Sequence, residues 1–350
     1  MIRRFFLLAV VVAALGAGAW WFLQYSLSQP YKGYEAPEQF VEIAQGDGSR
    51  SIARKLVDAG VVRDEWSFRA ALWQSGAARR LKAGEYRFDR PLAVRQVVDM
   101  LARGAVYLRQ VTFREGLTIR EMSRVYEAHC LGTAASFVKA AGDAALGRDL
   151  DPRAPDREGY LFPETYSLPR RSAASDLVKM MVGRFRNVFD EGLQAELRRQ
   201  GRDLREAVTL ASLVEKESAR AEERPLIAGV YRQRLKIGMA LQCDPTVIYA
   251  LDRAGRYKGN LTKEGLAFDS PYNTYRNPGL PPGPIAAPGR GALAAAIRPA
   301  DVDYLYFVSR NDGSHAFART LDEHNRNVHK YQVLYFRQKR LETAGQGTKH

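Results

Sequence analysis

An uncharged apolar run near the N-terminus constrains this chain more than any other feature of its sequence. Arg3 and Arg4 precede residues 5–23, a stretch of nineteen residues without an ionisable side chain. As a helix this stretch is roughly 28 Å long, which is enough to cross the apolar part of a bilayer. We therefore expect a transmembrane anchor at 5–25. The basic residues before it predict that residues 1–4 stay in the cytoplasm while the rest of the chain crosses.

A cleaved signal peptide is the alternative to a retained anchor. The segment Ala17-Gly-Ala19 resembles the small-residue pattern at which signal peptides are cut. The apolar run continues beyond that point through bulky side chains, and Trp20, Trp21 and Tyr25 stand where an interfacial aromatic belt belongs. A retained anchor fits this pattern better. In both cases the bulk of the chain lies outside the cytoplasm.

Length and charge limit the class of protein. A chain of 350 residues is long enough for two domains or more, each with its own core. Its 53 basic and 39 acidic residues give a net charge of +14, spread along the whole chain. Without an RNP run or zinc-finger spacing, this balance does not indicate a nucleic-acid partner. The two cysteines, Cys130 and Cys243, are expected to be unpaired, and the five histidines show no metal-ligand spacing.

Hydrophobic periodicity predicts a protein in which helices and short strands alternate irregularly. A polar linker at 26–39 would precede a small module at 40–106, followed by a larger domain at 107–340 and a flexible tail at 341–350. Expected strands lie at 40–43, 84–88, 107–113 and 304–308, and the aromatic run 158–166 is expected to be a loop. Expected helices lie at 51–59, 66–73, 94–101, 177–189, 193–213 and 324–340, with another opened by a capping box at Thr118–Glu121.

A polar helix end is the strongest candidate for a functional site. The run Leu210–Ala219 places Glu215 and Glu217 at the end of an otherwise apolar helix. Burying a carboxylate beside leucine and valine raises its pKa, a feature that marks functional sites. Two residues along a helix correspond to about 200° of rotation, so the two glutamates face different ways. One is expected to face substrate and the other solvent or a structural partner.

Two proline- and glycine-rich segments follow this helix. Ser270–Tyr275 leads into Gly279–Ile285, and Pro288-Gly289 comes shortly after. A run of this kind is a binding loop for an extended polymer or a rigid surface connection, and the residue pattern alone leaves both open.

Several motifs together resemble those of the MltG-type (YceG-like) endolytic murein transglycosylases. The resemblance runs from the anchor to about Tyr335, and it departs from the family pattern at Cys243, where a small hydroxyl residue is expected, and at Asn277-Pro278. The motifs are Glu158–Tyr166, Glu215-Lys-Glu217-Ser, Glu223-Arg224, Arg234–Met239, Leu241–Tyr249, Tyr272–Tyr275, Gly279–Ile285, Tyr304–Val308, His315-x-Phe317 and His324-Asn325.

The resemblance implies an α+β protein with an N-terminal transmembrane helix, a small LysM-like βααβ module and a larger mixed α/β catalytic domain. It implies a single-pass inner-membrane enzyme, with the catalytic domain in the periplasm. Such an enzyme cleaves the MurNAc–GlcNAc β-1,4 bond of nascent glycan strands, leaves 1,6-anhydroMurNAc ends and needs no cofactor. Partners would be peptidoglycan glycan strands, the lipid bilayer and peptidoglycan synthases. By position in the motif, the catalytic carboxylate is Glu217.

The remaining site residues are assigned by the same match. Glu215 is expected to support the site, paired with Arg224 or Arg234, and His315 or His324 to contact substrate. A structural alternative for Glu217 is a solvated helix end paired with Lys216 or Arg220. Expected substrate contacts are Gln242, Asp244, Tyr249, Asn273, Thr274, Tyr275, Pro282 and His315; expected supporting residues are Glu215, Arg224, Arg234 and Glu164. For Gln242, Asn273 and Tyr275 the alternative role is hydrogen bonding within turns and the core.

A single acid suffices for this chemistry, because the 6-hydroxyl of the sugar replaces both water and an enzymic nucleophile. A hydrolase on the same scaffold would need a second carboxylate, from Glu164 or Asp244, near Glu217. For Asp244-Pro245 the favoured interpretation is the start of a turn or helix. A third possibility is a cell-wall tether without catalytic activity that binds glycan through the small module.

Overall fold

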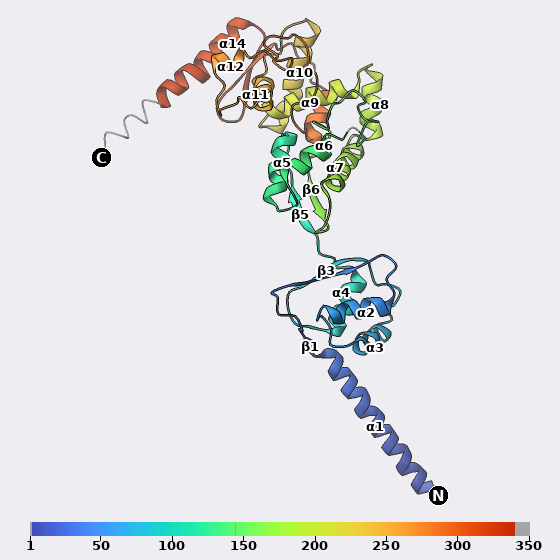
Figure 1. Cartoon of the computed structure of the whole chain (residues 1–350). Coiled ribbons are helices and arrows are strands. Elements are labelled where there is room, and N and C mark those ends of the chain that lie inside the picture. The colour runs from blue at the N-terminus through green and yellow to red at the C-terminus, as the bar shows by residue number, and fades with distance from the viewer. Residues whose placement is uncertain (1, 144, 340–350) are drawn as a thin grey trace, which may run out of the picture. The chain divides into compact units, whose positions relative to one another are not determined.

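The computed structural model describes residues 2–143 and 145–339, and Figure 1 shows their arrangement. The chain divides into two compact units. The first contains the residues up to Arg109 together with Ser167–Arg171, and the second contains Gln110–Tyr166 and the residues from Ser172 onward. The return of 167–171 to the first unit was not expected from the sequence. The predicted tail at 341–350 and the predicted helix end at Arg340 lie outside the described residues.

The N-terminal helix α1 (Ile2–Ser28) carries the apolar run. The most apolar 18-residue stretch within Phe5–Ser28 has a mean hydropathy of 2.2, and the segment is long and apolar enough to cross a membrane. Its last turns belong to the first unit, where Leu27 is fully buried in the core of the small module.

The small module is built on a βααβ arrangement. Strands β2 and β3 pair antiparallel with Val41 opposite Tyr86; α2 packs against β2, and α3 packs against α2 and α4. Alternation places Tyr86 and Phe88 in the core and Arg87 in solvent. The predicted strands and helices of this region are confirmed. In chain order the elements are β1 (Pro30–Tyr31), β2 (Gln39–Ile43), α2 (Ser49–Asp58), α3 (Glu65–Ser75), β3 (Gly84–Phe88), β4 (Leu92–Ala93) and α4 (Val94–Arg103).

The second unit combines helices with two-stranded sheets. Strands β7 and β8 pair antiparallel, with Phe307 opposite Phe317, and β5 pairs with β6. In chain order the elements are β5 (Arg109–Thr112), α5 (Ile119–Ala128), α6 (Ala134–Ala141), β6 (Thr165–Leu168), α7 (Ala174–Val188), α8 (Glu191–Arg199), α9 (Leu204–Glu217), α10 (Arg224–Lys236), α11 (Asp244–Arg253), α12 (Lys263–Leu266), α13 (Arg290–Ile297), β7 (Tyr306–Ser309), β8 (His315–Ala318) and α14 (Leu321–Val328).

Helix α9 lies at the centre of this unit. Every residue from Ala207 to Val214 is buried, and the helix packs against α10 and α13. A helix that is apolar on all sides is stable only when other elements surround it. This burial holds the helix end at Glu217 in one position.

Two expectations for this region were wrong. The helix predicted at 193–213 is two helices, because Gly201 adopts a left-handed φ of +63° and Asp203 begins α9 by accepting a hydrogen bond from the backbone N–H of Glu206. The aromatic segment 158–166, expected to be a loop, already enters strand β6 at Thr165. The capping box at Thr118 is confirmed. The closing helix begins at Leu321, earlier than predicted, and passes through a π-helical turn.

Candidate active site

The polar end of α9 directs three consecutive side chains to three different partners. Glu215 forms an ion pair with Arg224, Lys216 donates to the carbonyl of Gly116, and Glu217 accepts hydrogen bonds from buried side chains. The predicted opposite orientation of the two glutamates is therefore confirmed. Lys216 does not pair with Glu217, and neither does Arg220, which bonds the segment at Asp312. A solvated ion pair at this helix end is excluded.

One oxygen of the Glu217 carboxyl group is held by two donors. The hydroxyl of Tyr231 and the thiol of Cys243 both lie 3.3 Å from Oε1. Each donor is 1% exposed, whereas Glu217 is half-buried. A carboxylate oxygen has two lone-pair sites, so Oε1 is saturated. Among the described residues none hydrogen-bonds Oε2, which leaves this oxygen for a ligand.

Burial raises the pKa of Glu217 above its usual range. The negative charge of Asp244 raises this pKa further, while the Cys243 and Tyr231 donors and the charge of His315 lower it. Burial is the largest of these effects, in agreement with the expectation from the sequence. A carboxyl group with a raised pKa can hold a proton near neutral pH and release it to a substrate.

Glu215 acts as a structural connector. Its side chain is 6% exposed, and its oxygens contact Nη2 of Arg224 at 3.1 Å and the backbone N–H of Gly289 at 2.9 Å. Of the two partners predicted from the sequence, Arg224 is present. Arg234 instead donates to the carbonyls of Leu305, Ala240 and Leu241. Glu215 thereby joins the end of α9 to the start of α13.

His315 lies on β8 near Glu217 and is held by another carboxylate. Its ring Nδ1 is 2.7 Å from Glu223 Oε2, and its backbone N–H donates to Glu223 Oε1. The imidazole is 9% exposed and packs edge-on against Phe307. Glu223 therefore fixes the orientation of the imidazole.

The segment after α10 carries the exposed polar groups of the site. Gln242 is exposed and has a left-handed φ of +49°, a strained conformation for a side chain of this size. Asp244 is exposed in the first turn of α11, where Pro245 follows it, so the interpretation of this pair as a helix start is confirmed. Its carboxylate accepts a hydrogen bond from the hydroxyl of Tyr275, itself 36% exposed.

Asn273 and Thr274 are buried, in contrast to their exposed neighbour Tyr275. Both N–H donors of the Asn273 amide bond carbonyls of the preceding loop, at Leu266 and Phe268, and its oxygen accepts from the backbone of Tyr275. The hydroxyl of Thr274 accepts from the backbone N–H of Cys243. Both side chains are 0–1% exposed, so they organise the loop and do not face a ligand.

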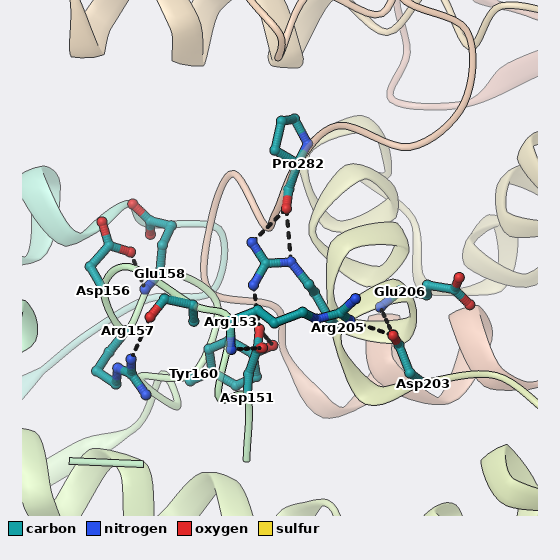
Figure 2. A network of polar contacts seen from close by, with 11 residues as sticks. Asp151, Arg153, Asp156, Arg157, Glu158, Tyr160, Asp203, Arg205, Glu206 and Pro282 are labelled. Carbon is teal, nitrogen blue, oxygen red and sulfur yellow. Dashed lines mark hydrogen bonds and ion pairs between the residues drawn. The ribbon is translucent and has the colours of Figure 1, made fainter. Parts of the chain in front are cut away.

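The proline-rich loop is tied to the start of α9. Figure 2 shows Arg205 of α9 donating twice to the carbonyl of Pro282 and once to the buried carboxylate of Asp151. Gly159 permits a close approach to the same loop, because a Cβ atom there would lie 2.4 Å from Pro284. The loop is thus a fixed wall of the second unit.

Tyr249 belongs to a second buried cluster, one turn or more along α11 from Asp244. Its hydroxyl donates to Glu158 Oε2 at 3.3 Å and accepts from Arg253 at 3.0 Å. Glu158 also accepts from the backbone N–H of Ile119 at the start of α5. Burial, aided by the charge of Asp156, raises the pKa of Glu158 to about 8.

Glu164, the other proposed second carboxylate, is occupied elsewhere. It forms a bidentate pair with Arg184 of α7, and both side chains are about two-fifths exposed. Asp244 is therefore the carboxylate that influences Glu217. The two cysteines are not bonded to each other, as expected. Within 2–143 and 145–339, no group of three or more His, Cys, Asp or Glu side chains is arranged to hold a metal ion.

Sequence reasoning missed the roles of Tyr231 and Glu223 and the contact between Cys243 and Glu217. Tyr231 lies in α10 between Val230 and Arg232, a context that indicates nothing about chemistry. Cys243 was noted only as a departure from the family pattern. Its position inside the Leu241–Tyr249 motif was the available signal.

Comparisons with known proteins identify the family of this chain. Residues 41–330 match the model of the YceG-like family. The chain is 31% identical over 322 residues to the endolytic murein transglycosylase of Bacillus subtilis (strain 168). The aligned region covers 87% of this chain and 88% of the relative. It is 29% identical over 357 residues to the endolytic murein transglycosylase of Streptococcus pneumoniae (strain D39), covering 91% of this chain but 63% of that longer relative.

A solved structure gives the same result. The 2.6 Å crystal structure of a YceG-like protein from Listeria monocytogenes superposes with a TM-score of 0.57 at 30% identity, over 83% of this chain and 98% of the other. Family match, sequence relatives and fold agree, and the chain belongs to the YceG-like family.

Proposed function

We propose that this chain is a membrane-anchored endolytic murein transglycosylase in which Glu217 is the acid and base. The observation that carries the proposal is the asymmetry of the Glu217 carboxyl group. Oε1 is saturated by Tyr231 and Cys243, so the proton that burial retains belongs on Oε2. The relatives named as endolytic murein transglycosylases support murein as the substrate.

The reaction follows from one carboxyl group acting twice. Oε2 of Glu217 donates its proton to the oxygen of the MurNAc–GlcNAc bond, and the bond from that oxygen to C1 of MurNAc breaks. The 6-hydroxyl of the same MurNAc then attacks C1 while its proton passes to Oε2. A 1,6-anhydro ring forms, GlcNAc leaves with a free hydroxyl, and Glu217 is protonated again. No water is consumed.

The neighbouring groups support this role in different ways. Asp244 raises the proton affinity of Glu217 through its charge, and the Tyr275 hydroxyl holds Asp244 in place. Exposed Gln242 and Tyr275 are the proposed sugar contacts, whereas Asn273 and Thr274 shape the loop that presents them. His315 is proposed to contact substrate from β8, oriented by Glu223.

The N-terminal helix and the small module complete the proposal. We propose that α1 anchors the chain in the inner membrane, with both units in the periplasm, because Arg3 and Arg4 precede the span. The βααβ arrangement of the small module supports weak, LysM-like glycan binding. Action on nascent strands would place the enzyme beside a peptidoglycan synthase.

Mass analysis of digested sacculi tests the proposal. The full chain should release muropeptides with anhydroMurNAc ends, one water lighter than the products of hydrolysis. Glu217→Gln should abolish them and retain the fold, while Glu164→Gln serves as a matched control with normal activity because Glu164 is paired with Arg184. Retained activity in Glu217→Gln would refute the assignment.

A two-carboxylate hydrolase is the second candidate function, because the charge of Asp244 acts on Glu217. That enzyme would yield reducing ends in the same analysis. The absence of any product, with binding to sacculi retained in Glu217→Gln, would instead indicate a tether without catalytic activity.

A further inference from the structure

A cavity at the far end of α11 from Asp244 has no role in the proposed reaction. It measures about 560 Å³ and is open to solvent on one side. Its walls come from the last turn of α11, the start of α9 and the two proline-containing loops. The lining includes Arg205, Arg253, Phe268, Asp269, Tyr272 and Pro282.

Arg253 presents an unused pair of donors to this cavity. Its Nη1 bonds the Tyr249 hydroxyl at 3.0 Å and lies 3.6 Å from a carboxylate oxygen of Asp156. Among the described residues none hydrogen-bonds its Nε or Nη2, and its side chain is 50% exposed. These two groups form the edge of the guanidinium that binds a carboxylate through two parallel hydrogen bonds.

The surroundings hold that guanidinium in place before any ligand arrives. Its plane lies over the ring of Tyr249, 5.7 Å from the centroid, and this ring packs against Tyr272 at 5.0 Å. In Arg205, by contrast, each of the three guanidinium nitrogens already donates to Asp151 or Pro282, as Figure 2 shows, and the side chain is a wall of the cavity. An oriented donor loses less entropy when it binds.

We propose that this cavity binds the stem peptide of murein, with Arg253 receiving a peptide carboxylate. The inference rests on the proposed function, because murein is the source of such a peptide. The stem carries free carboxylates and an amine-bearing side chain. Arg253 can bind a carboxylate of the stem, and exposed Asp269 at the rim can bind its amine. Phe268 and Tyr272 offer apolar contact.

The reach of the peptide agrees with the position of the cavity. Asp244 and Arg253 begin and end α11, nine residues apart, which is roughly 14 Å along a helix. An extended tetrapeptide spans about 13 Å. The loop that joins the two places carries Tyr275 beside Asp244 and Tyr272 beside the cavity. A stem whose attachment point lies beside Asp244 can therefore reach Arg253 along the length of α11.

Binding of free peptide tests the inference without requiring activity. The full-length Glu217→Gln protein in detergent is titrated calorimetrically with a tetrapeptide stem. We expect saturable binding that Arg253→Gln weakens about ten- to a hundredfold, as for loss of hydrogen bonds between charged groups. Arg253→Lys should be intermediate because lysine lacks the planar pair of donors. The matched control is Arg186→Gln, which removes an arginine of α7 that is paired with Asp149.

Turnover of two substrates provides the second readout. Arg253→Gln should raise KM on strands that carry stems and leave KM on amidase-treated, stem-free strands unchanged. Absence of peptide binding, or equal loss on both substrates, would overturn the inference. If the wild-type chain forms no anhydro ends at all, the proposed function fails, and the titration still decides whether the cavity binds peptide.

Discussion

Replacing Cys243 tests whether hydrogen bonds to Oε1 set the proton affinity of Glu217. The thiol donates to Oε1 at 3.3 Å and thereby stabilises the charged carboxylate, which lowers the pKa. Cys243→Ala removes that donor, so the pKa rises. Cys243→Ser supplies a hydroxyl, a stronger donor than a thiol, so the pKa falls.

The size of the effect follows from the strength of such bonds. A hydrogen bond to a charged group contributes about 1.5–3 kcal/mol, and a thiol lies at or below the lower limit. A change of about 1.4 kcal/mol alters the ionisation constant about tenfold. Because the acid must be protonated to act, activity is lost as pH rises through this pKa. The alkaline limb should therefore move to higher pH in Cys243→Ala and to lower pH in Cys243→Ser.

The assay is release of anhydro-muropeptides from sacculi across a pH series, with substrate in excess so that kcat is measured. Cys130→Ser, at an exposed site in the same unit, controls for loss of a thiol. Superimposable profiles for wild type and both Cys243 variants would refute the reasoning. So would a shift of the Ser variant toward higher pH.

Three further predictions concern buried polar residues of the second unit. Burial raises the pKa of Glu158 to about 8, above the unfolded value of 4.5, so the folded state holds a proton that the unfolded chain has released. The free energy of unfolding should therefore fall between pH 5 and 8, by up to about 1.4 kcal/mol per pH unit, and Glu158→Gln should flatten this slope in denaturant titrations. Glu215→Ala removes the buried ion pair with Arg224 and the hydrogen bond from Gly289, while Arg224 keeps its pair with Glu115, so the loss should be about 1.5–3 kcal/mol; a thermal unfolding midpoint equal to that of wild type would contradict it. Asn273→Ala removes three loop hydrogen bonds and should cost about 2–3 kcal/mol, while making the segment 266–277 sensitive to limited proteolysis.

Local patterns predicted much of the fold. Alternation identified the strand at 84–88, and the capping box at Thr118 marked the start of α5, because both depend on neighbouring residues alone. The break before α9 was missed because a single glycine is tolerated within a helical pattern and only its φ reveals the turn. The orientation of Glu215 and Glu217 was predictable, since it follows from helical rotation.

The contacts that define the site were beyond such patterns. Tyr231 and Cys243 meet Glu217 from α10 and from the start of α11, and no local spacing encodes their convergence. Asn273 was expected to contact sugar because it is polar and lies in a loop. Its burial depends on carbonyls at Leu266 and Phe268, whose direction only the folded loop determines.

Helix α9 is hydrogen-bonded to the proline-rich loop at two points, through Arg205 to Pro282 and through Glu215 to Gly289. Arg205 and Glu215 are ten positions apart, which corresponds to roughly 15 Å of helix, and the loop must span the same length. Adding or deleting one residue of α9 between these contacts would rotate one of them out of register by about 100°, and a change in loop length would move Gly289 relative to Pro282. Chimeras between relatives should therefore exchange helix and loop as a single cassette, because neither part can change its length independently.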